Sequence, residues 1–404
     1  MSIPKGKRIP LFLVSVALYW FSFFCYMPIL TEYVRAFSTT QMTGTIIASY
    51  GLMQVIFRVP IGMLSDKLKM RKYFVTGACA LAALATLGMA LVPISGWALV
   101  FRALMGIAVS TWVPYSALFS SYVKDDAAGQ NIGLMVTSNY SGQMLGTLLG
   151  GWVISLTGQM NTAFFISVAA AALCMFCSLF LVEQKKSDFP ENPEPFKEQV
   201  KVLKSPMLVW AAILFAIMQL PTFGGVYGFS PTFATQNAAA DTSQLGIMST
   251  LVTVTAIVGA SVSSKLPDWL RGMENCLLLS FVLLTIYCIT IPFIRSMALF
   301  YALHLVFGFV RGLATSQTMS IAICDIDPAK RGTAMGFYQA IYGIGMALGP
   351  QLVGLFGRSA LGQVNLPGLT LGYMVMAALQ VVGAVCSVTV VKKLLHKSCA
   401  STAA

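Results

Sequence analysis

The sequence predicts an all-α polytopic membrane protein with twelve transmembrane helices arranged in two six-helix repeats. Its composition, its series of long apolar segments and a repeated glycine pattern indicate this fold class. Of the 404 residues, 57% are hydrophobic and 10% are charged, whereas soluble domains average about 25% charged residues. So few charges cannot cover a water-soluble globule of this length, and we expect the chain to lie in a lipid bilayer.

Twelve apolar segments follow one another, separated by charges or turn residues. Each is about 20 residues or longer, which is enough to cross about 30 Å of hydrocarbon as a helix. The expected helices cover residues 10–34, 41–64, 73–93, 96–118, 131–155, 161–182, 205–228, 243–264, 275–294, 297–320, 332–356 and 368–391.

The distribution of Lys and Arg predicts the orientation of the chain. With the amino terminus in the cytoplasm, 20 of the 26 cations fall in cytoplasmic segments, and three, Arg35, Arg295 and Arg358, fall in outer loops. Because cytoplasmic loops carry an excess of Lys and Arg, we expect both termini in the cytoplasm and a location in the cytoplasmic (inner) membrane. The net charge of +12 does not indicate nucleic-acid binding, because the cations are not gathered on one soluble face.

The polar segment 183–204 divides the chain into a bundle at 1–182 and a second bundle at 205–404. It is expected to be a cytoplasmic linker, with residues 196–203 either forming a short amphipathic surface helix or continuing the linker.

The sequence of the first bundle is repeated in the second. A shift of 202 or 203 residues superimposes Gly44 on Gly246, Asp66 on Asp268, Gly106 on Gly308, Gly142 on Gly345 and Gly146 on Gly349. Many secondary transporters are built from such a duplication, with the substrate site at mid-membrane between the repeats.

The stretch from Gly62 to Lys72 combines four cations with Asp66 and is expected to be a tight cytoplasmic loop. It resembles the loop between the second and third helices of the major facilitator superfamily, whose pattern Gly-x-Leu-Ala-Asp-Arg-x-Gly-Arg-Arg is matched at Gly62, Leu64, Asp66, Lys67 and Arg71. Lys69 and Met70 depart from it. The resemblance implies a cytoplasmic gate formed by Gly62, Asp66, Lys67 and Arg71, with Asp268 as the repeat partner; an exposed loop charge is the alternative for Asp66.

A stripe of small residues marks the fifth expected helix. Gly142, Gly146 and Gly150 recur every four residues, so one face lacks side chains and a neighbouring helix can approach closely. The antiporter branch of the superfamily has a similar stripe with a proline, which is replaced here by Thr147. In the repeat partner, Gly349 is followed by Pro350. The resemblance therefore favours export by exchange, and simple helix packing is the alternative.

Four basic residues fall inside expected helices. A charge inside the membrane is costly, so such residues are candidates for a functional role. Arg102 resembles the Arg of the superfamily's Arg-xxx-Gly signature, which implies proton coupling, or else it snorkels outward. His304 is a second candidate for coupling, with neutral packing as the alternative. Arg311 lies too deep to snorkel easily and is expected to face a cavity. Arg58 shares a helix stripe with Gly62 and Asp66.

The acidic residues all lie in loops or near helix ends, and Glu32 comes closest to a span interior. No buried carboxylate is therefore expected to attract a cationic compound. An amphipathic substrate pocket is predicted from polar and aromatic residues near mid-depth, although the same residues also suit packing and anchoring. They are Trp20, Phe24, Asn139, Gln143, Gln219, Tyr338 and Tyr342, together with Arg311.

No metal-ligand cluster, phosphate-binding loop or nucleophile-base pair is evident, so neither an enzyme nor a metal or cofactor beyond a proton gradient is expected. The sequence predicts a monomeric secondary transporter that exports a small neutral or anionic organic compound with proton coupling. An uptake carrier or exchanger for organic anions and a non-transporting membrane sensor are the alternatives. The identity of the transported compound is not predicted.

Overall fold

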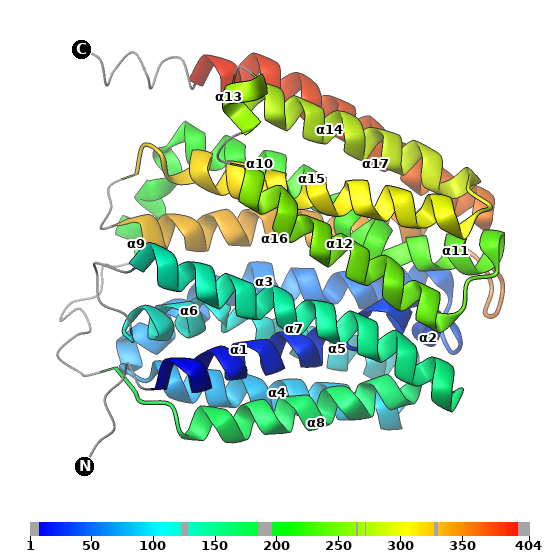
Figure 1. The fold of residues 1–404 in the computed structure, drawn as a ribbon, viewed down its shortest axis with the longest axis horizontal. Helices are drawn as coiled ribbons and strands as arrows, with labels where there is room; N and C mark the ends of the chain where they lie inside the picture. Colours follow the sequence, from blue (N-terminus) through cyan, green and yellow to red (C-terminus); the bar gives the residue numbers. More distant parts are fainter. Residues whose placement is uncertain are drawn as a thin grey trace.

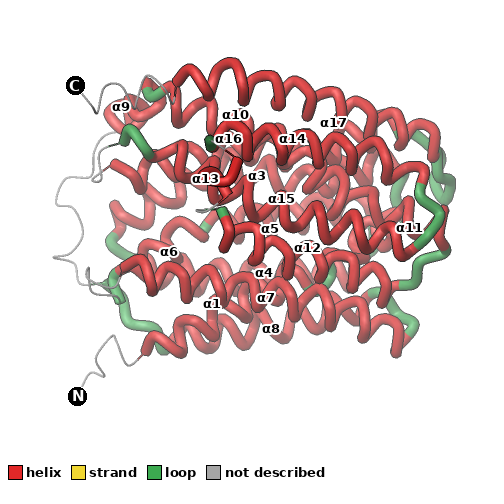
Figure 2. Tube along the Cα trace, turned by 45° about the horizontal axis from the view of Figure 1, so that its top comes forward, coloured by secondary structure: helices red, strands yellow, loops and turns green. Residues whose placement is uncertain are grey.

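The computed structural model describes residues 8–122, 128–184, 196–263, 266–270, 272–326 and 330–394. Within these ranges the regular secondary structure is all helical, the helices are joined by loops, and no strand is formed (Figure 2). The start of α1 and the last helical residues lie at one end of the bundle (Figure 1). We call this the cytoplasmic end and the opposite one the outer end, after the predicted topology. Residues 185–195, in the predicted linker, lie outside the described residues.

The helices of the first half occupy the lower part of Figure 1 and those of the second half the upper part. The first half contains α1 (Ile9–Phe24), η2 (Met27–Ile29), α2 (Leu30–Arg35), α3 (Thr40–Leu68), α4 (Arg71–Leu91), α5 (Ser95–Ser110), α6 (Trp112–Ser120), α7 (Ala128–Thr157) and α8 (Asn161–Leu179). The second half contains α9 (Phe196–Gln199), η5 (Val200–Lys204), α10 (Pro206–Leu220), η6 (Pro221–Phe229), α11 (Ser230–Ala238), α12 (Thr242–Val262), α13 (Leu266–Leu270), α14 (Met273–Thr290), η7 (Ile291–Phe293), α15 (Met297–Ile323), α16 (Arg331–Phe356), α17 (Leu366–Cys386) and η9 (Ser387–Val391).

Ten helical segments within the described residues are long and apolar enough to cross a membrane. The chain is therefore a multi-pass membrane protein. Two further helices, α7 and α16, contain 30 and 26 residues, so at 1.5 Å per residue each extends for more than about 35 Å. The count of twelve spans stays a prediction.

The halves meet mainly through two helix pairs, α3 with α16 and α7 with α12. Small residues permit both contacts. A Cβ on Gly44 would lie 2.5 Å from the Pro350 carbonyl oxygen, and a Cβ on Gly151 would lie 2.9 Å from the Gly246 Cα. Because no side chain separates the backbones at these points, the halves approach as closely as helices can.

The expected loop at Gly62–Lys72 is shorter than predicted. Helix α3 continues to Leu68 and ends at Lys69, which adopts a left-handed φ of 55°. Gly62, Asp66 and Lys67 therefore lie in the last turns of α3, and Arg71 begins α4. The charges suggested a loop, yet they are compatible with a helix that emerges from the membrane, and Lys67 suits the negative end of the helix dipole.

Two further boundaries differ from the sequence prediction. Helix α12 ends at Val262, so Asp268 belongs to the separate short helix α13, whereas its repeat partner Asp66 lies within α3. The side chain of Asp268 lies outside the described residues. The expected helix 205–228 runs ten residues further, to Ala238, through the π-helix η6. The expected helix already included Pro221 and the three glycines of η6, and the π-helical segment accommodates them while the span continues through α11.

Candidate functional site

The two halves are joined by side chains at the outer end. The Thr31 hydroxyl donates to the Gly228 carbonyl oxygen at 2.5 Å. The Thr232 hydroxyl donates to the Glu32 carboxylate at 2.7 Å, and Arg35 pairs with the same carboxylate at 2.9 Å. Each threonine bond crosses from one half to the other, so this end of the molecule is closed.

Helices α3 and α16 keep one antiparallel register from the outer end inward. Gly44 contacts Gly354, Gly51 contacts Ala347 and Val55 contacts Gly343.

The same register places Gly62 opposite Gly336, and there the contact is absent. A Cβ on Gly62 would meet Val113 of its own half, and a Cβ on Gly336 would have no described atom within 4 Å. The two helices therefore diverge towards the cytoplasmic end.

The predicted gate residues at the cytoplasmic end bond within the first half. Arg71 donates to Asp66 at 2.7 and 2.9 Å and to Gln184 at 2.5 Å. Lys67 is exposed. Asp66 thus anchors the start of α4 to the end of α3 in this conformation, while the register of α3 and α16 places it opposite the start of α16 at Arg331.

Arg58 lies at the last contact before the helices diverge. Its guanidinium donates to Gln54 of its own helix at 2.6 Å, and across the interface to Gln339 at 2.8 Å and Tyr342 at 3.2 Å. The side chain is 3% exposed, and its Nε has no hydrogen-bond partner. All three acceptors are neutral, so the contacts described for this buried guanidinium include no counterion.

Arg311 projects from α15 to the same region. It donates to the Tyr227 hydroxyl at 2.9 Å, and its guanidinium carbon lies 5.5 Å from the centre of that ring. Tyr140 of α7 and Tyr342 of α16 lie within electrostatic range of it. The side chain is half-buried, and the contact described for its guanidinium is with the phenol of Tyr227.

Aromatic side chains extend this region into the first half. The Phe24 ring lies 5.6 Å from the Tyr227 ring, and the Trp20 ring lies 6.0 Å from Phe24. The Trp20 indole N–H is buried without a hydrogen-bond partner. The structure thus brings Phe24, Arg311 and Tyr342 of the predicted pocket together between the halves, with Trp20 beside them.

The remaining predicted pocket residues lie on neighbouring helices. The Gln143 side-chain amide donates to Asn139 at 2.5 Å, and its own Oε1 is buried without a partner. Tyr338 is buried, shares a hydrogen bond of 2.7 Å with Thr318 and stacks on a phenylalanine of α10. Gln219 is buried in α10.

The sequence analysis missed Tyr140, Tyr227 and Gln339. Gln54 stands one helical turn before Arg58, a spacing that signals a shared helix face. Nothing in the sequence indicated that Tyr140 and Tyr227 interact with Arg311, or that Gln339 bonds Arg58, because each pair lies more than 80 residues apart in the chain.

Arg102 does not snorkel outward. It is 1% exposed, donates to the Tyr26 hydroxyl at 3.0 Å, and has its guanidinium carbon 4.5 Å from the Tyr50 ring centre and 5.3 Å from that of Phe23. These partners all belong to the first half. Arg102 is therefore enclosed by aromatic rings within one bundle.

His304 is enclosed in the second half in a similar way. One ring nitrogen lies 2.8 Å from the Phe300 carbonyl oxygen and the other 3.4 Å from the Tyr287 hydroxyl. A neutral ring that carries its proton on Nδ1 satisfies both contacts.

The glycine stripes pack inside the halves. Cβ atoms on Gly142 and Gly146 would collide with the backbone of α1, one on Gly150 with that of Cys25, which directly follows α1, and one on Gly349 would lie 2.5 Å from the Leu220 carbonyl oxygen. Pro350 lies inside α16, with its carbonyl oxygen against Gly44. The stripe residues therefore fix α1 on α7 and α10 on α16.

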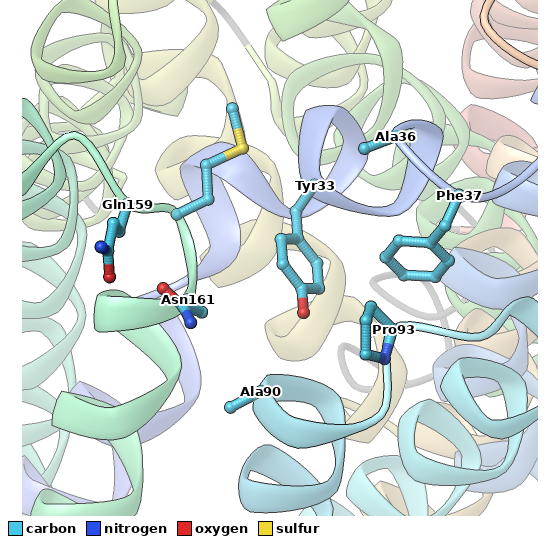
Figure 3. A pocket seen from close by; sticks show the side chains of 8 residues that line it. Tyr33, Ala36, Phe37, Ala90, Pro93, Gln159 and Asn161 are labelled. Carbon is cyan, nitrogen blue, oxygen red and sulfur yellow. The ribbon is translucent and has the colours of Figure 1, made fainter.

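The hollow in Figure 3 lies apart from this region. It has a volume of about 480 Å³ and is lined by residues near the outer end of the first half, among them Tyr33, Phe37, Pro93 and Gln159. The Tyr33 hydroxyl donates to the Met89 backbone at 2.7 Å. None of the arginines lines this hollow, so the candidate site is the Arg58 and Arg311 region.

The model for the Major Facilitator Superfamily matches residues 12–350. The chain belongs to this superfamily. The predicted resemblance is thereby confirmed, and the superfamily is one of membrane transporters.

Two relatives carry the name multidrug resistance protein MdtG. The protein of Proteus mirabilis is 26% identical over 349 residues, which cover 82% of this chain and 84% of the relative. That of Escherichia coli K12 is 23% identical over 258 residues, and this alignment covers 62% of each chain.

Solved structures share the fold. A bacterial homologue of the human lysosomal transporter Spinster, in an inward-facing and unoccupied conformation, superimposes with a TM-score of 0.77 at 14% identity, covering 96% of this chain and 97% of that one. The nucleoside transporter NupG gives a TM-score of 0.71 at 16% identity, covering 96% of this chain and 98% of that one.

Proposed function

We propose that this member of the superfamily exports small neutral or anionic organic compounds across the cytoplasmic membrane, in exchange for protons, by alternating access. The protein acts as a monomer with both termini in the cytoplasm. The names of the MdtG relatives support export of foreign compounds. The substrate meets the half-buried guanidinium of Arg311 between the halves.

Arg311 is the observation that carries the proposal. Its contacts are phenol groups, and a guanidinium inside the membrane needs compensation from water or from an anion. The ion pairs among the described residues, Arg35 with Glu32 and Arg71 with Asp66, both lie near the ends of the bundle. A substrate that is anionic, or neutral with strong hydrogen-bond acceptors, therefore suits this site, with Trp20, Phe24 and Tyr342 packing against its apolar part.

Alternating access uses the divergence of α3 and α16. The closed outer end and the separated pair Gly62 and Gly336 fit a conformation that admits substrate from the cytoplasm. In the opposite conformation Gly62 meets Gly336, and Asp66 moves next to Arg331 at the start of α16. Lys67, Arg71 and Asp268 then stabilise the closed cytoplasmic gate.

Proton coupling involves Arg102 or His304, as the sequence indicates, but each is enclosed in one half. Glu32 is the carboxylate that accepts a hydrogen bond across the halves. Protonation of Glu32 removes its charge, so it weakens both the ion pair with Arg35 and the charge-assisted hydrogen bond from Thr232. Proton uptake at the outer end thus favours opening there.

The same arginines suit an uptake carrier or exchanger for organic anions, and the direction of transport separates the two functions. Purified protein is first screened for thermal stabilisation by a panel of metabolites and drugs, because a ligand of the native state raises the melting temperature. Inverted membrane vesicles with an acidic interior are then tested with the compound that binds. Export by proton exchange predicts accumulation that an ionophore abolishes. Accumulation by right-side-out vesicles in acidic medium indicates uptake, and binding without flux indicates a sensor.

A further inference from the structure

Two arginines, one from each half, interact with Tyr342. The Tyr342 hydroxyl accepts a hydrogen bond of 3.2 Å from Arg58 of α3, and the same side chain lies within electrostatic range of Arg311 of α15. The Arg58 guanidinium carbon is 6.0 Å from the centre of the Tyr342 ring. The two cations are therefore near the same aromatic ring but do not share an acceptor.

Neither arginine has a carboxylate among its described contacts. Arg58 bonds two glutamine amides and a phenol, and its Nε is buried without a partner. Arg311 bonds the phenol of Tyr227. Two guanidinium groups in a region of low dielectric repel each other and are poorly solvated, so an occupant with two negative charges compensates both.

We propose that Arg58 and Arg311 form a two-point site for a small organic dianion whose negative charges lie at opposite ends, such as an aromatic dicarboxylate. The inference rests on the proposed transport function and adds Arg58, which the sequence analysis placed only beside the gate. Each arginine binds one carboxylate, and the planar guanidinium suits bidentate pairing. The rings of Phe24, Tyr227 and Tyr342 pack against the body of the ligand.

Binding at Arg58 also changes the contact between the halves. A carboxylate is a stronger acceptor than the neutral oxygens of Gln339 and Tyr342, because charge-assisted hydrogen bonds are roughly twice as strong as neutral ones. The anion therefore displaces these two residues from Arg58 and loosens α16 from α3 at the point where the helices diverge. Arg58 in this way connects occupancy of the site with movement of the halves.

The test uses the purified full-length chain and three probes that share one benzene ring. Terephthalate carries two carboxylates, benzoate carries one, and terephthalamide is neutral. Dissociation constants are measured for the wild type, Arg58→Gln, Arg311→Gln and Arg295→Gln. Arg295 is exposed near the outer end, so its replacement makes the same change of charge away from the site.

We expect terephthalate to bind the wild type at least about 10-fold more tightly than benzoate, because its second carboxylate accepts charge-assisted hydrogen bonds from the second guanidinium; a factor of ten corresponds to about 1.4 kcal/mol. Either Arg58→Gln or Arg311→Gln is expected to remove this preference, and Arg295→Gln to retain it. Arg58→Lys keeps the charge and provides the measurement if Arg58→Gln does not fold. A weaker preference for terephthalate over benzoate in Arg58→Lys also supports the proposal, because lysine lacks the planar guanidinium that pairs with a carboxylate through two hydrogen bonds.

Equal binding of terephthalate and benzoate to the wild type, or a preference that survives in Arg58→Gln, overturns the proposal. Tighter binding of phenyl phosphate, which carries both charges on one group, also overturns the two-point geometry. If none of these anions binds and inverted vesicles still accumulate a neutral compound, the dianion site is refuted and the export function stands.

Discussion

The two ends of the α3 and α16 pair carry the same kind of residues and make different contacts. At the outer end, Gly44 and Gly354 bring the two backbones together. About five turns further along the same register, Gly62 and Gly336 are also glycines, yet neither contacts the other. Both ends are built for close approach and only one is closed. The difference therefore reflects the conformation of the molecule and not the size of its side chains, as expected of a transporter with two alternating states.

The orientation of the two ends relative to the membrane is tested by cysteine labelling, which we expect to occur from one side only at each position. A cysteine placed at Asn192 is expected to react with a membrane-impermeant reagent only from the cytoplasmic side, and one placed at Gly362 only from outside, because the cations are concentrated on one side. Labelling of intact cells and of inverted vesicles is compared. A reversed pattern contradicts the naming of both ends.

Closure of the outer end depends on Gly44. Gly44→Leu forces a side chain against the Pro350 carbonyl oxygen and Gly354, so we expect transport to fall at least about 10-fold, since overpacking at a helix contact costs about 1–3 kcal/mol. Gly77→Leu in α4 is the matched control, because a Cβ there would have nothing within 4 Å. Wild-type transport by Gly44→Leu at normal expression would show that the outer contact is not required.

At the cytoplasmic end, Asp66→Asn removes the charge that binds Arg71 and that faces the start of α16 in the opposite conformation. We expect a folded protein, identified by an unchanged elution profile and melting temperature, with transport reduced several-fold, because an exposed ion pair contributes only about 0–1 kcal/mol. Lys204→Gln, at an exposed position in η5 outside the gate, serves as the comparison. Normal rates in Asp66→Asn refute the gate assignment.

Asp241 provides an effect on stability that is independent of either gate. Its carboxylate caps α12, and hydrogen bonds from the Ser243 side chain and the Gln244 backbone lower its pKa below the ordinary value of 3.8. The stabilisation is therefore fully present above about pH 4 and is lost as the pH falls through the lowered pKa. Asp241→Ala should cost about 1 kcal/mol at pH 7, and the deficit should shrink below pH 4 in thermal melts while transport persists. A deficit that is unchanged at pH 3 would contradict the capping role.

Some features of the two ends of α3 and α16, and of the fold around them, could be predicted from the sequence. Composition and spacing predicted a multi-pass helical protein, and the pattern from Gly62 to Arg71 predicted the superfamily. The end of α3 was placed too early because its charges suit a loop and an emerging helix equally well. The continuation of the expected helix 205–228 through α11 to Ala238 was missed because a proline, here Pro231, usually ends a helix. Tyr227 lay inside the expected helix, but its contact with Arg311 joins residues 84 positions apart and could not be foreseen from the sequence.

Arg58 illustrates a second limit. Its cost inside the membrane was evident from the sequence, and its shared stripe with Gly62 and Asp66 was predicted from helical spacing. Its acceptors Gln339 and Tyr342 lie more than 280 residues away, so only the register of α3 and α16 reveals them. Arg102 carries the same charge but bonds entirely within one half, a distinction that depends on tertiary packing.

Cross-linking of the two ends tests the alternating movement most directly. In a background that lacks the nine cysteines and retains transport, two cysteine pairs are compared, Thr40→Cys with Ser359→Cys at the outer end and Gly62→Cys with Gly336→Cys at the cytoplasmic end. The hydroxyls of Thr40 and Ser359 lie 2.7 Å apart. We predict that each pair cross-links in energised membranes, that each cross-link stops transport until it is reduced, and that no molecule carrying both pairs forms both cross-links. Formation of both cross-links in the same molecule, or continued transport while either pair is cross-linked, would contradict alternating access through α3 and α16.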